Sequence, residues 1–93
     1  MFEIVTSTKF LKDLKLLKKR SVKDLESLQQ LITVLAESGH KGLDKKHKPH
    51  KLSGNYKGYW ECHVKPDLLL MRDENEQINL LELVRTVTHS DLF

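Results

Sequence analysis

Apolar residues change their spacing partway along this 93-residue chain, and that change limits the folds open to it. Between residues 8 and 38 they recur every three or four positions, which is the repeat of an amphipathic helix. From residue 56 onward they fall in short strand-like runs separated by turn residues. The pattern predicts helices first and a β-sheet second, within a chain long enough for one domain over residues 1–93.

Two helix start signals lie close together in the first half. The segment Thr6-Ser7-Thr8 can supply the N-cap of a helix that ends near Lys19-Arg20. Ser21 and Asp24 resemble a capping box for a second helix, which ends at Ser38-Gly39. Because almost no loop separates the two helices, they must form a hairpin.

The second half predicts a sheet with short connections. Strand-like runs at residues 56–64, 68–72 and 77–84 are separated by turns at 65–67 and 73–76, and a short strand at residues 2–5 precedes the helices. The run 68–71 is apolar on both faces, as in a central strand. We expect an α+β fold in the order β-α-α-β-β-β, with the helical hairpin packed on one face of a small antiparallel sheet and a basic loop at 40–53.

Positive charge is concentrated in two segments. Residues 1–20 carry six Lys or Arg against two acids, and residues 41–58 carry six against one. Such segments favour a polyanionic partner, because neutralising phosphates releases counterions. Lysine-rich surfaces also keep small proteins soluble, so charge alone leaves both interpretations open. Tyr56 and Trp60 can likewise stack on bases or simply pack on the sheet.

The cysteine content and the N-terminus indicate where the protein works. Cys62 is the only cysteine, so no intramolecular disulfide can form, and a reducing cytoplasm fits. The first residues lack an export signal, and no apolar run reaches the ~18 residues of a membrane span. We expect a cytoplasmic protein with no membrane partner. Cys62 adjoins His63, but strand neighbours face opposite ways, so Cys62 is expected in the core.

The second half of the chain contains a group of polar residues that packing alone does not require: His50, His63, Asp67, Arg85 and His89. In an antiparallel meander, the His63–Asp67 turn and the segment from Arg85 to His89 fall at one end of the sheet. Histidines with an arginine can cleave RNA without a metal. One group takes the proton of the 2′-hydroxyl, another protonates the 5′-oxygen, and the cation stabilises the phosphate.

Other interpretations of these residues stay open. Each histidine can be an ordinary surface or hydrogen-bonded residue. His50, His63, His89 and Asp67 are also competent zinc ligands, but their spacing matches no metal motif. We expect neither a metal nor another cofactor.

Two segments resemble a known family. Residues 50–70, HKLSGNYKGYWECHVKPDLLL, resemble the H-x-L-x-G-x-[WY]-K-G-x-x-[ED]-x-H-[IV]-x-P-D-x-[LI]-L core of YafQ-like toxins in the RelE/ParE superfamily. Residues 85–93, RTVTHSDLF, resemble that group's R-x-[GV]-[ST]-H-x-x-L-F ending. The usual family residues are replaced at Pro49, Trp60, Leu68 and Met71, while the histidines are retained.

The resemblance implies a bacterial type II toxin that cuts translated mRNA on the ribosome as an endoribonuclease. It implies a catalytic role for His50, His63, Asp67 and His89. It also implies that Arg85 holds phosphate and that Phe93 helps to position the mRNA. The implied partner is an acidic antitoxin with a ribbon-helix-helix end, through which the complex would bind operator DNA.

The basic loop suggests how the ribosome would be recognised, because Lys45, Lys46 and Lys48 can contact RNA phosphates without reading sequence. Two alternatives remain. One is a non-catalytic protein on the same scaffold, either a ParE-like gyrase inhibitor or a partner that binds only antitoxin and DNA. The other is an unrelated small RNA-binding domain.

Overall fold

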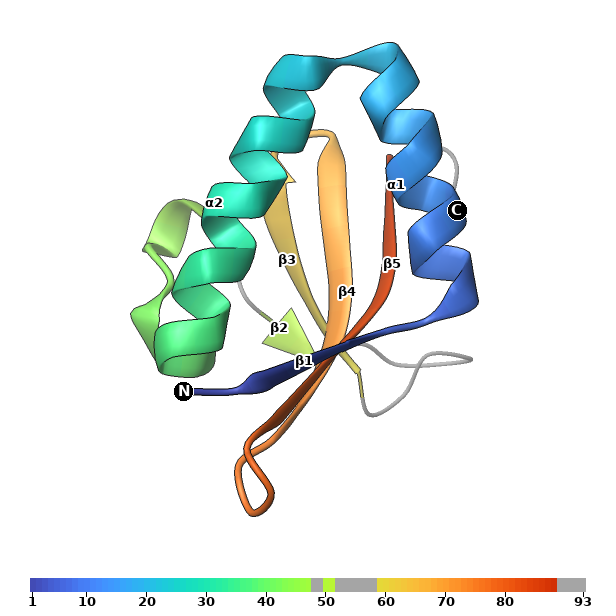
Figure 1. Cartoon of the computed structure of the whole chain (residues 1–93). Helices are drawn as coiled ribbons and strands as arrows, with labels where there is room; N and C mark the ends of the chain where they lie inside the picture. The colour runs from blue at the N-terminus through green and yellow to red at the C-terminus, as the bar shows by residue number, and fades with distance from the viewer. Residues whose placement is uncertain (48–49, 52–58, 89–93) are drawn as a thin grey trace.

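The protein has two layers, with two helices covering one face of a sheet, in a computed structural model that describes residues 1–47, 50–51 and 59–88 (Figure 1). Strand β1 is followed by helices α1 and α2, two short 3₁₀ turns (η1 and η2), and strands β2 to β5. Their bounds are β1 Glu3–Thr6, α1 Thr8–Arg20, α2 Val22–Ser38, η1 Gly39–Gly42, η2 Lys45–His47, β2 His50–Lys51, β3 Trp60–Lys65, β4 Leu68–Asn75 and β5 Leu80–Thr88. The predicted α+β class is confirmed, and the predicted elements occur in the expected order. Strand β2 and the two 3₁₀ turns are additional, within the segment expected to be a loop.

Local side-chain chemistry sets the ends of both helices. Ser7 Oγ accepts a hydrogen bond from the Phe10 amide at 3.0 Å, and Ser21 Oγ accepts one from the Asp24 amide at 3.1 Å. Helix α2 ends at Gly39, whose φ of 65° suits a residue without a Cβ. All three helix signals in the sequence are therefore confirmed.

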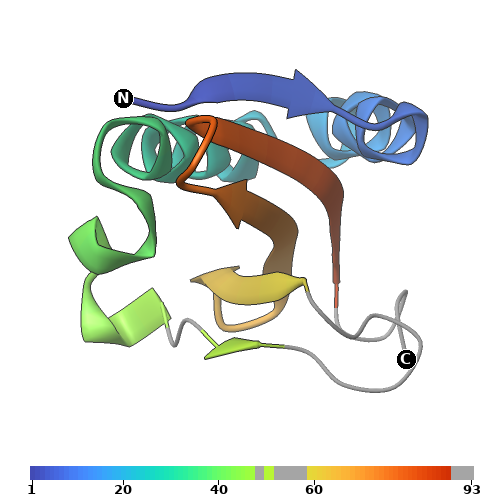
Figure 2. The same ribbon diagram turned by 90° about the horizontal axis from the view of Figure 1, so that it is seen from below.

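The sheet is mixed, in the order β1-β5-β4-β3-β2 (Figure 2). Strands β2 to β5 pair antiparallel, as expected of a meander, but β1 pairs parallel with β5. The expectation of a wholly antiparallel sheet was wrong for this strand. Its partner is the last strand of the chain, which no local pattern near β1 could indicate.

The β4–β5 connection also differs from the prediction. Strand β4 continues through residues 73–75, and the turn lies at residues 76–79. Asn75 Oδ1 accepts hydrogen bonds from the Gln77 and Ile78 amides, and Asn79 takes a φ of 52°. This hairpin projects beyond the two-layered body (Figure 1). Residues 73–75 extend the pairing of β4 with β5, so their polarity did not mark the turn.

The core lies between the helices and the sheet. Phe10, Leu17, Leu28, Leu31 and Leu35 come from the helices, and they pack on β-sheet residues Cys62, Val64, Leu68, Leu70, Leu81 and Leu83. The whole run 68–71 is buried in the central strand β4, as its two-faced apolarity predicted. No helix in the described ranges is long and apolar enough to cross a membrane.

Candidate functional site

The strand register brings two distant polar segments to one end of the sheet. His63 pairs with Leu69, which pairs with Val87 on the far side of the central strand. Leu68, the first residue after the β3–β4 turn, pairs with Thr88 at the end of β5. The predicted proximity of the His63–Asp67 turn and the end of β5 is confirmed.

The β3–β4 turn presents His63 and Asp67. Asp67 is exposed in a two-residue turn with Pro66, and His63 is half-buried one strand position before a β-bulge. His63 Nδ1 lies 3.3 Å from the Pro66 carbonyl oxygen. A carbonyl oxygen only accepts, so this contact is a hydrogen bond in the tautomer that carries the hydrogen on Nδ1.

A further histidine, His47, contacts this turn and was not singled out from the sequence. Its Nδ1 donates a 2.6 Å hydrogen bond to the His63 carbonyl oxygen at the bulge. The bond links η2 in the basic loop to β3. The loop has little periodicity, so only its histidines hinted at such an anchor.

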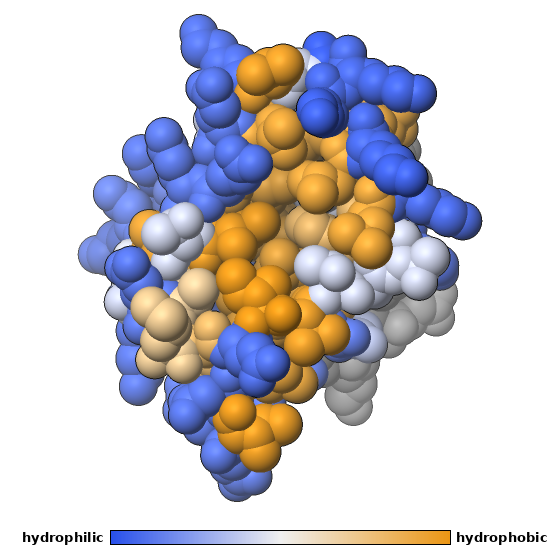
Figure 3. Space-filling view, viewed as in Figure 1, coloured by the Kyte–Doolittle hydropathy of each residue, from blue (hydrophilic) through white to orange (hydrophobic). Residues whose placement is uncertain are grey.

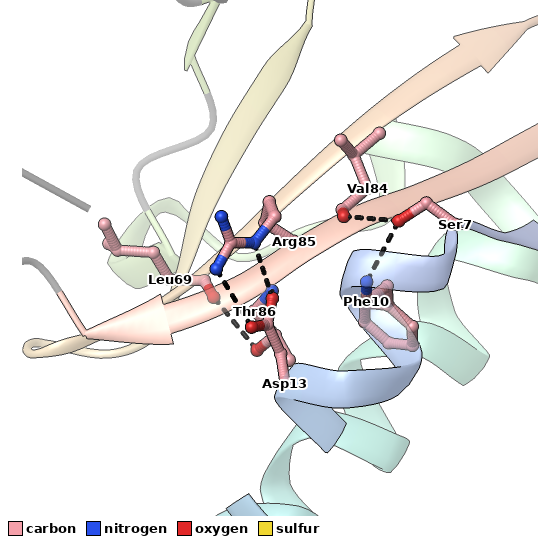
Figure 4. Close-up of polar contacts among 7 residues, drawn as sticks. All are labelled: Ser7, Phe10, Asp13, Leu69, Val84, Arg85 and Thr86. Atoms are coloured by element: carbon pink, nitrogen blue, oxygen red, sulfur yellow. Dashed lines mark hydrogen bonds and ion pairs between the residues drawn. The ribbon is translucent and has the colours of Figure 1, made fainter. Parts of the chain in front are cut away.

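Arg85 makes a two-pronged ion pair with a residue of α1 (Figure 4). Its Nε donates to Asp13 Oδ2 at 2.7 Å, and its Nη2 donates to Asp13 Oδ1 at 3.0 Å. The side chain of Arg85 stays 25% exposed and that of Asp13 11%. Sequence reasoning missed Asp13, although it lies on the same helical stripe as the buried Phe10 and Leu17.

Helix α1 completes the outer edge of β5 where β1 stops. Strand β1 pairs with β5 only as far as Leu83. Beyond it, Ser7 Oγ donates to the Val84 carbonyl at 2.7 Å, and Asp13 Oδ2 accepts from the Thr86 amide at 3.1 Å (Figure 4). The side chains of Ser7 and Asp13 therefore supply, on both sides of Arg85, hydrogen bonds that a neighbouring strand would otherwise make to β5.

A groove of about 290 Å³ runs between α1 and this end of the sheet. Its lining includes Asp13, Arg20, Lys65, Asp67 and Thr88. Opposite charges meet at its rim, where Lys65 Nζ lies 2.6 Å from an Asp24 carboxylate oxygen. The groove joins Asp67 of the β3–β4 turn to Thr88 of β5, whereas His63 lines a second groove of about 690 Å³ together with His47 and Lys46.

The other predicted site residues are only partly described. Lys45 and Lys46 are exposed in η2, as expected for a basic loop. His50 lies in β2, opposite Glu61 of β3, but its side chain is outside the described part. Lys48, His89 and Phe93 lie outside the described residues.

Trp60 and Cys62 belong to packing and not to the groove. Lys51 Nζ lies 5.5 Å from the Trp60 ring centroid, and the Arg72 guanidinium carbon lies 5.8 Å from it. Cys62 is fully buried, and burial raises its pKa to about 11, against a smaller lowering by Arg72. The thiol is therefore protonated and inert at neutral pH.

No three His, Cys, Asp or Glu side chains among the described residues are arranged to hold a metal ion. The alternative zinc set proposed from the sequence includes His50 and His89, whose side chains are outside those residues. The described turn thus offers His63 and Asp67 for proton transfer. Arg85 lies two residues before Val87, the β5 residue in line with His63 and Leu69.

Comparison with known proteins places these features in one family. Residues 2–93 match the family model for YafQ, described as a bacterial toxin of a type II toxin-antitoxin system. The chain is 38% identical over 91 residues to the mRNA interferase toxin YafQ of Escherichia coli K12, covering 98% of this chain and 95% of that protein.

Solved structures agree with this match. The E. coli DinJ–YafQ complex superposes with a TM-score of 0.86 at 38% identity, covering 100% of this chain and 99% of the matched chain. A metal-bound toxin from Helicobacter pylori superposes with a TM-score of 0.86 at 45% identity, covering 100% of both chains. The resemblance seen in the two sequence motifs is confirmed, and the chain belongs to the YafQ family of type II toxin-antitoxin toxins.

Proposed function

We propose that this protein is the toxin of a bacterial type II system and cleaves mRNA bound to the ribosome in the cytoplasm. The E. coli relative at 38% identity is an mRNA interferase toxin. The observation that carries the proposal is the meeting of the His63–Asp67 turn with the end of β5, the strand that also carries Arg85. These are the residue types that metal-independent RNA cleavage needs.

The proposed reaction is a transesterification at phosphorus. A base, drawn from His50, His63 and Asp67, removes the 2′-hydroxyl proton, and the 2′-oxygen forms a bond to phosphorus. The bond to the 5′-oxygen breaks as His89 protonates that oxygen. Arg85 stabilises the charge on the phosphate, and Phe93 positions the mRNA. The Nδ1–H tautomer of His63 suits the base role, because its lone pair is on Nε2.

Binding to the ribosome is assigned to a surface separate from the chemistry. Lys45, Lys46 and Lys48 would contact rRNA phosphates, and exposure of the first two supports this. The His47–His63 bond links that loop to the catalytic turn. Neutralising the three lysines should weaken ribosome sedimentation and flatten its salt dependence. Unchanged binding would reject the docking role.

A cognate antitoxin is the proposed protein partner, as in the E. coli DinJ–YafQ complex. Figure 3 shows apolar side chains gathered over the space between α1 and α2, with hydrophilic residues around them. Exposed apolar residues on these helices include Leu11, Leu16 and Val22. An acidic antitoxin could cover such a surface, and through its ribbon-helix-helix end the complex would bind operator DNA.

The test is expression of the chain alone, followed by mapping of mRNA ends. We expect growth arrest, with new ends only in translated messages. The change His89→Ala should lower cleavage about 10²- to 10⁴-fold, because it removes the general acid. Glu76→Gln in the exposed β4–β5 turn is the matched control and should cleave normally. Intact mRNA with falling gyrase activity would instead support the ParE-like alternative.

A further inference from the structure

We propose that Asp13 is a positioning residue for cleavage, which holds the Arg85 guanidinium in the orientation that meets the phosphate. The inference rests on the proposed function, since it assigns Arg85 a phosphate to bind. This role would add Asp13 of α1, which lies outside both sequence motifs, to the residues that support cleavage.

The contact geometry supports positioning. Both carboxylate oxygens of Asp13 accept hydrogen bonds from the guanidinium, one from Nε at 2.7 Å and one from Nη2 at 3.0 Å. A side-on bidentate pair fixes the plane of the guanidinium as well as its place. Arg85 keeps a quarter of its side chain exposed, so the pair lies at the surface and not in the interior.

Asp13 is itself rigidly held. It lies on the stripe of α1 that carries the buried Phe10 and Leu17, and its Oδ2 also accepts the Thr86 amide at 3.1 Å. The Thr86 hydroxyl in turn donates to the Leu69 carbonyl of the central strand at 3.0 Å. The carboxylate is thus anchored to the sheet, and an anchored partner can transmit a fixed geometry to Arg85.

The charge of α1 makes the choice of residue at position 13 informative. Asp13 is the only acid in a helix with five lysines and one arginine. A surface helix evolved simply to be basic would have no need of a carboxylate on its sheet-facing stripe. Without Asp13, Arg85 would face a helix of like charge, and it would spend less time near β5.

The decisive experiment is a double-mutant cycle on the cleavage rate of mRNA already bound to ribosomes. Asp13→Asn keeps the side-chain shape but presents an amide N–H toward Arg85, and we expect a rate about 10- to 100-fold lower with unchanged ribosome affinity. Asp13→Asn should cause no additional loss in an Arg85→Ala background, because the group that it positions is already gone. Asp13→Glu, which retains a carboxylate, should recover part of the rate.

Ser7→Ala is the matched control. It removes another side-chain link between α1 and β5, the bond to the Val84 carbonyl, without touching Arg85. We expect a lower melting temperature but a normal rate for bound mRNA. An equal loss of rate in Ser7→Ala would overturn the proposal, by showing that only the docking of α1 matters.

The remaining outcomes separate this inference from the proposed function. A faster Asp13→Asn enzyme would mean that Asp13 restrains Arg85, and multiplicative losses in the cycle would mean that the two residues act independently. Either result overturns the positioning role alone. Wild-type protein that leaves ribosome-bound mRNA intact would overturn the proposed function itself.

Discussion

Two arginines on neighbouring strands form ion pairs with acids in contrasting ways. Arg85 of β5 reaches Asp13 through two hydrogen bonds and stays 25% exposed. Arg72 of β4 is fully buried, and its Nη2 lies 3.3 Å from Glu74 Oε1. In the described part of the chain, the Arg72 nitrogens make no hydrogen bond within the geometric limits.

The contrast separates a functional charge from a structural one. A phosphate-binding arginine needs fixed geometry together with access, and the Arg85 pair has both. A fully buried pair lacks access, and its attraction is offset by the cost of removing two ions from water. We therefore assign Arg85 to the substrate and Arg72 to the interior beside Trp60 and Cys62.

The largest expected effect follows from breaking the Arg72 pair. Arg72→Met should destabilise the fold by about 3–5 kcal/mol, because Glu74 would keep a buried charge without this cation. Urea unfolding measures the loss. Changing both residues, Arg72→Met with Glu74→Met, should recover most of it, since neither member of this buried pair then remains, although Glu61 stays buried in both variants. A double variant as unstable as the single one would contradict the electrostatic explanation.

Removing the other arginine should mainly affect the chemistry. Arg85→Gln is expected to lower the cleavage rate of bound mRNA about 10²- to 10³-fold, comparable to loss of one transition-state donor. Its unfolding midpoint should change less than that of Arg72→Met, because the Arg85 pair is partly exposed. If Arg85→Gln lost as much stability as Arg72→Met, the proposed difference between a functional Arg85 and a structural Arg72 would be contradicted.

Alkaline pH should lower the free energy of unfolding through Cys62, which lies near Arg72. Burial raises the thiol pKa from 9.0 to about 11, so the folded state holds its proton more tightly than the unfolded chain. This contribution is fully present below pH 9 and is lost as pH rises from 9 to 11. Unfolding free energies measured at pH 8, 9, 10 and 11 should fall less steeply in Cys62→Ala. If the unfolding free energies of wild-type protein and Cys62→Ala fell equally with pH, the raised pKa of Cys62 would not be the cause.

The smallest effect is expected at His47, which links the basic loop to strand β3 just before the β3–β4 turn. His47→Ala should lose about 1 kcal/mol of stability, the usual net value of one hydrogen bond. His47→Asn can place an amide N–H near the position of Nδ1 and should retain part of it. Thermal melts of both variants check this, and equal losses would indicate that the bond to the His63 carbonyl contributes little.

Much of the fold follows from local chemistry, and the exceptions follow from long-range contacts. Ser7 and Ser21 cap the helices through hydrogen bonds to residues only three positions further along the chain. The helix starts could therefore be predicted from the local sequence. The parallel pairing of β1 with β5 depends on segments at opposite ends of the chain. Residues 73–75 have turn-like composition, yet they pair with residues 80–82 of β5, a contact that the local sequence does not reveal.

The site shows the same division. Its motifs predicted that the His63–Asp67 turn would meet the end of β5, because antiparallel strands fix that topology. Asp13 lies outside both motifs, and its one signal is a carboxylate on the apolar stripe of a basic helix. The contact to Arg85 spans 72 positions of sequence, which periodicity cannot reveal.

The central claim is that Arg85, with the residues of the β3–β4 turn, cleaves ribosome-bound mRNA by 2′-hydroxyl attack. The most direct measurement is the chemistry of the RNA ends produced by purified protein on programmed ribosomes. The account predicts a 2′,3′-cyclic phosphate and a 5′-hydroxyl, at a rate sharply reduced in Arg85→Gln and normal in Glu76→Gln. Intact mRNA, or ends with a 3′-hydroxyl and a 5′-phosphate, would contradict it.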